Sequence, residues 1–140
     1  MKNTTPILLS LFLVLFGLAG TGCGKKTPEI DAAYYQSPEG TFYTIQQVRL
    51  QLTEALEKKN LRYIHDNIYY FKNLCAALSA KLQGEKKQRV DAVLAEINEI
   101  SEEIDNSAGR GNQSATEANL QKLIDELKAL ETEFKLPKKK

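Results

Sequence analysis

Imidazole and thiol groups, which proteins often use for metal binding and nucleophilic catalysis, are scarce in this chain. Beyond the first 23 residues they occur only at His65 and Cys75. On one helix these two residues would lie about 15 Å apart along the axis and about 80° apart around it, so they cannot chelate one ion together. The only methionine is Met1, so His65 has no second axial ligand for haem, and the covalent motif Cys-x-x-Cys-His is absent. We therefore expect no metal and no cofactor.

Catalytic arrangements are also missing from the sequence. A di-iron carboxylate site needs Glu-x-x-His on two helices, but Arg62 stands three residues before His65 and there is no second histidine. A serine nucleophile would have no histidine base. The glutamates at positions 96, 99, 102 and 103 are expected to form a solvated acidic face. The sequence thus predicts no enzyme activity. Cys75 is expected to be a small buried residue of the apolar stripe. His65 is expected to hydrogen-bond a carboxylate or a tyrosine hydroxyl, the alternative being a pH-sensitive contact or a ligand.

Tyrosine is distributed unevenly along the chain. All six tyrosines lie in the first half: Tyr34, Tyr35, Tyr43, Tyr63, Tyr69 and Tyr70. Tyr63 and Tyr70 are seven residues apart and would share one side of a helix. Clustered exposed tyrosines are typical of protein interfaces, so Tyr63, Tyr70 and His65 form the candidate partner-binding patch. The alternative is that the segment containing the first three tyrosines covers this patch.

Apolar residues at alternating steps of three and four predict the helices that must position these groups. The clearest stripe runs from Leu61 to Leu82, with Asn60 as N-cap and Gly84 as the terminating left-handed residue. Other stripes predict helices over about 41–59, with Thr41 or Thr44 as its cap, over 85–106, and from Ser114 to about residue 134. The stripe residues are Ile45, Val48, Leu52, Ala55, Leu56, Leu61, Ile64, Ile68, Phe71, Cys75, Leu78, Leu82, Val90, Val93, Leu94, Ile97, Ile100, Ile104, Leu120, Leu123, Ile124, Leu127, Leu130 and Phe134.

Short connections between these helices favour antiparallel neighbours. Residues 107–113 form the longest predicted loop and the one expected to be most mobile, and Ser114 with Glu117 has the spacing of a capping box. The predicted fold class is therefore all-α, an antiparallel up-down-up-down four-helix bundle over residues 41–136. A three-helix core with the first helix detached is the structural alternative.

The first 22 residues have the layout of an export signal. Lys2 precedes an apolar stretch over 7–18, which is followed by the small residues of 19–22 and then by Cys23. This layout resembles bacterial lipoprotein signal peptides, although that family prefers Leu where Gly20 stands. The resemblance implies that Cys23 is lipidated and becomes the new N-terminus. It also implies outer-membrane sorting, because Gly24 stands where inner-membrane members have Asp.

Two other outcomes for the leader stay open. Ordinary signal peptidase cleavage near residues 19–21 would release a soluble protein, and residues 6–22 could stay as a short membrane anchor. With lipidation, the chain would be organised as a signal peptide over 1–22, a flexible lipid-anchored tether over 23–40, the bundle over 41–136 and a basic tail over 137–140.

A weaker resemblance involves residues 61–68, which contain Ile64 followed by His65. They resemble a helical segment of small exported bacterial bundle proteins of poorly defined function. In those proteins a second histidine often lies late in the third helix, whereas residues 103–106 here contain none. The missing histidine argues against a shared metal role. The alternative function is nevertheless a ligand-, metal- or haem-binding bundle of cytochrome b562-like architecture that uses His65.

Charge excludes one class of partner. Residues 27–137 contain 13 basic and 18 acidic residues, so this body is negative and does not suit nucleic acid. The main functional hypothesis is a non-enzymatic protein of the bacterial cell envelope, held to the membrane by its lipid on the periplasmic or surface face. Its bundle would bind another envelope protein or act as a spacer.

Overall fold

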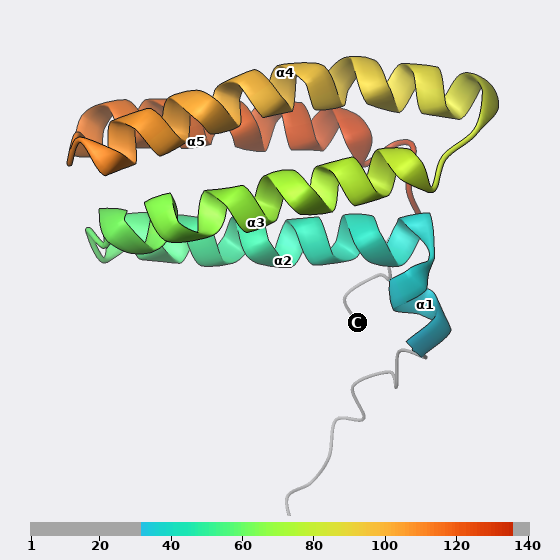
Figure 1. Cartoon of the computed structure of the whole chain (residues 1–140), viewed down its shortest axis with the longest axis horizontal. Coiled ribbons are helices and arrows are strands. Elements are labelled where there is room, and N and C mark those ends of the chain that lie inside the picture. Colours follow the sequence, from blue (N-terminus) through green and yellow to red (C-terminus); the bar gives the residue numbers. More distant parts are fainter. Residues whose placement is uncertain (1–31, 136–140) are drawn as a thin grey trace, which may run out of the picture.

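The computed structural model describes residues 32–135, and the regular secondary structure of this part of the chain is helix, with no strand (Figure 1). Its helices are α1 (Ala32–Gln36), α2 (Pro38–Glu57), α3 (Leu61–Ala80), α4 (Gly84–Gly109) and α5 (Gln113–Leu130). The all-α prediction is therefore confirmed. The predicted signal peptide, the lipidation site Cys23 and the basic tail lie outside the described residues.

The four long helices form two antiparallel hairpins, α2–α3 and α4–α5, which stack as two layers (Figure 1). Contacts join α3 to α4 and, less extensively, α2 to α5. Each predicted stripe faces the space between the layers, because every stripe residue is buried or half-buried there. None of the described helices is long and apolar enough to cross a membrane.

The start of α2 differs from the prediction. Ser37 is the N-cap, since its Oγ accepts a hydrogen bond from the Gly40 N–H at 3.0 Å, and Pro38 occupies the first helical turn. Thr41 and Thr44, the predicted caps, instead donate to backbone carbonyls within the first turns of the helix. A Cβ atom at Gly40 would lie 1.8 Å from the Tyr34 carbonyl oxygen, so α1 packs here only because this residue is glycine. The predicted tether over 23–40 thus overlaps residues that are helical.

The predicted long loop over 107–113 is wrong. α4 continues through Gly109 because Ser107 and Ala108 are buried, and only three residues separate α4 from α5. Asn112, not Ser114, caps α5: its side-chain oxygen accepts from the Ala115 N–H at 3.1 Å. The last helix also ends at residue 130 rather than near 134.

The two hairpins have the same turn. Lys59 and Gly111 adopt left-handed backbone conformations, with φ of 56° and 70°. Asn60 and Asn112 follow them, and each caps the next helix by accepting from the backbone N–H three residues later, at 3.1 Å in both turns. Each asparagine N–H also donates to the carbonyl five residues earlier, at 2.8 and 2.9 Å. This second bond closes the preceding helix in a Schellman arrangement.

The core repeats with the turns. Asn60 and Asn112 are 52 residues apart, and buried residues recur at the same spacing. The pairs in which both residues are buried and apolar are Phe42 and Leu94, Ile45 and Ile97, Leu52 and Ile104, Ile68 and Leu120, Phe71 and Leu123, Cys75 and Leu127, Leu78 and Leu130, and Leu82 and Phe134. Residues 52 apart therefore occupy equivalent positions in the two hairpins, with α3 corresponding to α5.

Candidate functional site

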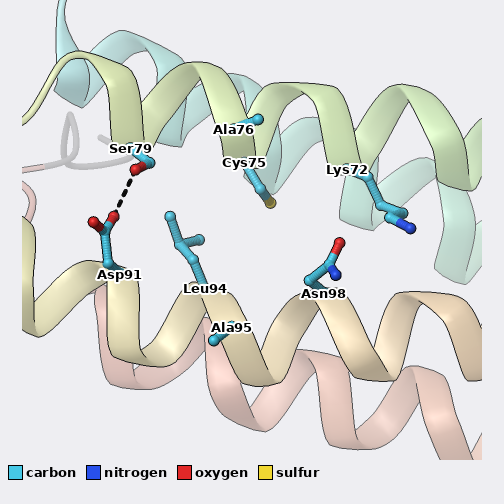
Figure 2. Close-up of a pocket in the computed structure, with 8 residues that line it drawn as sticks. All are labelled: Lys72, Cys75, Ala76, Ser79, Asp91, Leu94, Ala95 and Asn98. Atoms are coloured by element: carbon cyan, nitrogen blue, oxygen red, sulfur yellow. Dashed lines mark hydrogen bonds between the residues drawn. The ribbon is translucent and has the colours of Figure 1, made fainter.

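A shallow cleft of about 260 Å³ lies between α3 and α4 (Figure 2). It is lined by Lys72, Cys75, Ala76 and Ser79 from α3 and by Asp91, Leu94, Ala95 and Asn98 from α4. Ligand sites are usually larger, from roughly 300 to 1,000 Å³, and enclose most of the ligand. The cleft is too small for most cofactors, so any chemistry in it would depend on the polar side chains that line it.

Ser79, Lys87 and Asp91 form a polar cluster at one end of this cleft. The Ser79 hydroxyl donates to Asp91 Oδ1 at 2.6 Å, as Figure 2 shows, and Lys87 Nζ donates to Ser79 Oγ at 2.7 Å. Lys87 Nζ also contacts the Ser79 carbonyl oxygen at 3.0 Å and Asp91 Oδ2 at 2.9 Å. These hydrogen bonds, first from Ser79 and then from Lys87, lower the pKa of Asp91.

This cluster has the composition of a serine–lysine catalytic pair but not the arrangement. A lysine base must accept the serine proton, whereas Lys87 uses all three ammonium donors on Ser79 and Asp91. The serine proton points to Asp91 instead. The cluster joins the C-terminal end of α3 to the first turns of α4, so its geometry is that of a structural clamp.

Cys75 lies in the floor of the cleft and is buried, as the sequence predicts. Burial raises the pKa of its thiol to about 12. The reactive form of cysteine is the thiolate, so Cys75 is protonated and unreactive near neutral pH. Among residues 32–135 there is no group of three His, Cys, Asp or Glu side chains that could hold a metal ion.

His65 pairs with a carboxylate from another helix. Its Nδ1 lies 2.7 Å from Oδ1 of Asp105 in α4, and both side chains are about half exposed. Gly109, one turn further along α4, lies beneath the imidazole, since a Cβ there would be 3.2 Å from His65 Nδ1. The predicted contact with a carboxylate is therefore confirmed. A ligand role for His65 stays a prediction.

The six tyrosines divide into two groups. Tyr34, Tyr35 and Tyr43 pack together where α1 meets α2, with ring centroids 5.9 to 6.5 Å apart. The pKa of Tyr34 is raised, mainly by burial and then by the charge of Glu39. The other three tyrosines lie on α3.

The predicted patch on α3 is spread over different surroundings. Tyr63 packs against the core, Tyr70 is 51% exposed, and His65 is directed to Asp105 of α4. Its role in binding a partner stays a prediction. The most exposed large apolar side chain of the described residues is Tyr69, at 70%, which the predicted patch did not include.

Tyr69 belongs to an uncharged strip that we name the outer α3 face. It consists of Tyr69, Tyr70, Asn73, Ala76, Ala77 and Ala80, which point away from the core and are exposed except for the half-buried Ala77. The sequence contains the signal for this face, because these residues lie opposite the apolar stripe of α3 at steps of three and four. All large apolar side chains classed as exposed in the described part lie on α1–α3: Tyr35, Leu50, Tyr69 and Tyr70.

Both ends of the described chain lie at one end of the molecule. Phe134, just after α5, stacks on Phe42 of α2 with ring centroids 4.6 Å apart, and Lys86 Nζ lies 4.4 Å from the Phe134 ring. α1 packs on the same end of α2 (Figure 1). The described chain therefore begins, at Ala32, and ends, at Lys135, at the same end of the molecule.

Comparison with known proteins assigns no family. No protein-family model, no curated protein and no solved structure matches this chain significantly.

Proposed function

We propose that this chain is a lipid-anchored protein of the bacterial cell envelope that functions by protein–protein contact and not by catalysis. In this proposal Cys23 is the lipidated residue, and the described helices form an up-down-up-down four-helix bundle beside the membrane. The observation that carries the proposed interaction role is the exposed, uncharged outer α3 face on a helix whose other side is well packed.

The contacts between helices support the bundle. Each long helix touches two others, in the cyclic order α2, α3, α4, α5 and back to α2, and one core includes side chains from all four. Helices of this length are marginal in isolation, so packing of their apolar stripes supplies most of their stability. A detached first helix has no support, since Phe42, Ile45 and Leu52 of α2 are completely buried.

The position of the chain ends supports attachment at the α1 end. Ala32 is nine positions after Cys23, which limits the distance to the lipid to about 30 Å even for an extended chain. The basic residues nearest the two ends of the mature chain are Lys25, Lys26, Lys138, Lys139 and Lys140. Because the described chain begins and ends at the α1 end, attachment there would let these charges add attraction to anionic lipids of about 1 kcal/mol each when near the surface.

The polar clusters support a non-catalytic role. The polar groups of Ser79, Lys87 and Asp91 are engaged with one another in the clamp. Cys75 is a buried thiol with a raised pKa, and His65 is paired with Asp105. By contrast, the tyrosines of the outer α3 face make no contribution to the core, and tyrosine is a residue that interfaces favour. The bundle would hold this face outside the membrane, within reach of other envelope proteins.

Metabolic labelling tests the anchor. The full chain, expressed with its leader in a bacterial host, is expected to incorporate a palmitate analogue and to fractionate with membranes. Cys23→Ala should abolish both the label and the membrane association, whereas Cys75→Ala, the matched control at the other cysteine, should keep both. An unlabelled wild-type chain, or a label that persists in Cys23→Ala, would show that the lipoprotein assignment is wrong.

A further inference from the structure

We infer that the outer α3 face binds the same face of a second copy of this chain, with the two α3 helices antiparallel about a two-fold axis that passes near Asn73. This inference rests on the proposed interaction role and specifies its partner. It depends on the comparison of α3 with α5, on the order of large and small residues along the face, and on its lack of charge.

The equivalent helix α5 indicates that the fold does not need this face. Positions 69, 70, 73 and 76 of α3 correspond to Gln121, Lys122, Asp125 and Lys128 of α5, all of which are exposed. In α5 these residues interact with one another, as Gln121 donates to Asp125 at 3.2 Å and Lys128 lies 3.4 Å from it. A helix in this position is therefore stable with an ordinary charged surface. Tyr69 and Tyr70 of α3 therefore need another explanation, and an interface supplies it.

The order of residues along the outer α3 face makes the face complementary to itself. In an antiparallel pair of α3 helices centred on Asn73, each residue lies opposite a residue of the second copy that is the same number of positions from Asn73 in the other direction. Tyr69 then faces Ala77 of the second copy, and Tyr70 faces Ala76. A bulky ring over a small residue lets the two helices approach closely. At the axis the two Asn73 side chains meet, and an amide can both donate to and accept from its own copy.

Charge distinguishes this face from its counterpart. The outer α3 face has no ionised residue, and Asp66 at its edge would lie opposite Ala80 of the second copy. The same pairing on α5, centred on Asp125, would bring two aspartates together and place Lys122 opposite Lys128. Like charges placed opposite one another are destabilising. Only the first pairing is compatible with a two-fold interface.

The size of the face predicts a weak dimer. Residues 69 to 80 extend over only about 17 Å of one helix. A face of this length buries less area than the roughly 800 Å² per partner of a standard interface. Chains held by lipids in one membrane meet at a raised local concentration, which favours such weak contacts. We therefore expect the dimer to form on membranes at expression levels where the detergent-diluted protein is monomeric.

Disulfide formation in isolated envelopes tests the two-fold axis. The full chain with Asn73→Cys should form a disulfide-linked dimer on mild oxidation, because a cysteine at the axis meets its own copy within the 4.4–6.8 Å Cα separation that a disulfide needs. Asp125→Cys, at the equivalent position of α5, is the matched control. We expect about tenfold more dimer from Asn73→Cys than from this control, because the proposed interface raises the local concentration of one introduced thiol around the other. The unsubstituted chain measures any background from its own cysteines.

The register has its own test. Asp66→Cys and Ala80→Cys should form little dimer alone but should cross-link to each other when the two variants are produced together. Adding Ala76→Glu to Asn73→Cys should abolish the cross-link without changing the helical circular dichroism, because Ala76 is exposed and its partner would be Tyr70. Equal cross-linking of Asn73→Cys and Asp125→Cys, no dimer from Asn73→Cys, or no mixed product would overturn the inference.

Lipid labelling of the same samples separates this inference from the proposed anchor. Labelled chains that fail to cross-link refute the dimer and leave the lipid anchor intact. Unlabelled chains that cross-link specifically at Asn73 support the dimer and refute the anchor.

Discussion

The α2–α3 and α4–α5 hairpins are alike inside and different outside. Their turns share a left-handed residue followed by a capping asparagine, and their buried residues recur 52 positions apart. Their outward surfaces diverge: α3 exposes Tyr69 and Tyr70, whereas the equivalent positions of α5 are Gln121 and Lys122. Packing therefore accounts for what the hairpins share, and the outward residues of α3 are where a function separate from folding is expected.

The largest expected effect tests the shared interior. Phe71→Ala and Leu123→Ala remove completely buried side chains from equivalent positions, so each should lower the free energy of unfolding by about 2–5 kcal/mol. Tyr70→Ala, next to the first site but half exposed, should change it by less than about 0.5 kcal/mol. Urea denaturation followed by circular dichroism measures all three. A large loss from Tyr70→Ala would mean that the outer α3 face belongs to the fold.

The next effect concerns the two left-handed residues. Gly111→Ala should cost about 1–2 kcal/mol, because a Cβ atom is unfavourable at φ of 70°. Lys59 already bears such a side chain at φ of 56°, so Lys59→Gly should stabilise the protein by about 0.5–1 kcal/mol. Thermal and urea unfolding of the two variants measures these changes. Changes of the same sign would contradict the equivalence of the turns.

Periodicity was sufficient to predict most of the fold. Residues such as Ile64, Ile97 and Leu127 are buried where the stripes place them, because a helix that must cover a core repeats its apolar residues every three to four positions. Periodicity does not predict the positions where local hydrogen bonds allow a polar residue to be buried or determine where a helix ends. Thr116 lies outside the predicted apolar stripes, yet it is buried and its hydroxyl donates to the Asn112 carbonyl at 2.8 Å. The end of α4 differs from the prediction for the same reason, since the polar Ser107 is buried at the core where the sequence predicts a loop.

The candidate site was less predictable than the fold. The sequence predicts that His65 contacts a carboxylate or a tyrosine hydroxyl, but the identity of the partner, Asp105, depends on how α3 and α4 pack. The clamp of Ser79, Lys87 and Asp91 joins residues of two helices, and no spacing in one helix indicates it. A comparison of the two halves at a spacing of 52 would have revealed the unusual outer α3 face from the sequence.

A smaller effect compares the two capping asparagines. Asn60→Ala and Asn112→Ala each leave a backbone N–H at the start of a helix without its partner, and each should cost about 1 kcal/mol. The two losses should agree to within about 0.5 kcal/mol and should be additive in the double variant, because the sites share no partner. Urea unfolding of the singles and the double measures this. A cost confined to one asparagine would show that the turns are alike in geometry but not in energy.

The smallest effect concerns the junction between the hairpins and depends on pH. The pKa of Asp91 is lowered in the folded protein, first by Ser79 and then by Lys87, so its ionised form stabilises the fold above the ordinary aspartate pKa of about 3.9. This stability is lost as the pH falls through the lower pKa of the folded state. Asp91→Asn should therefore be less stable than wild type at neutral pH, and the difference should disappear at about pH 2.

Glu54→Gln provides the control for Asp91, since hydrogen bonding to Lys58 also lowers the pKa of Glu54, but Glu54 lies in the last turn of α2 and Lys58 is the C-cap of the same helix. Both carboxylates are accessible to solvent, so neither effect should be large. The loss at neutral pH should be greater for Asp91→Asn, because Asp91 connects α4 to the end of α3 and holds the two hairpins together. Unfolding midpoints in urea at both pH values measure the difference. Equal losses would mean that the junction depends on apolar packing alone, as the interior of each hairpin does.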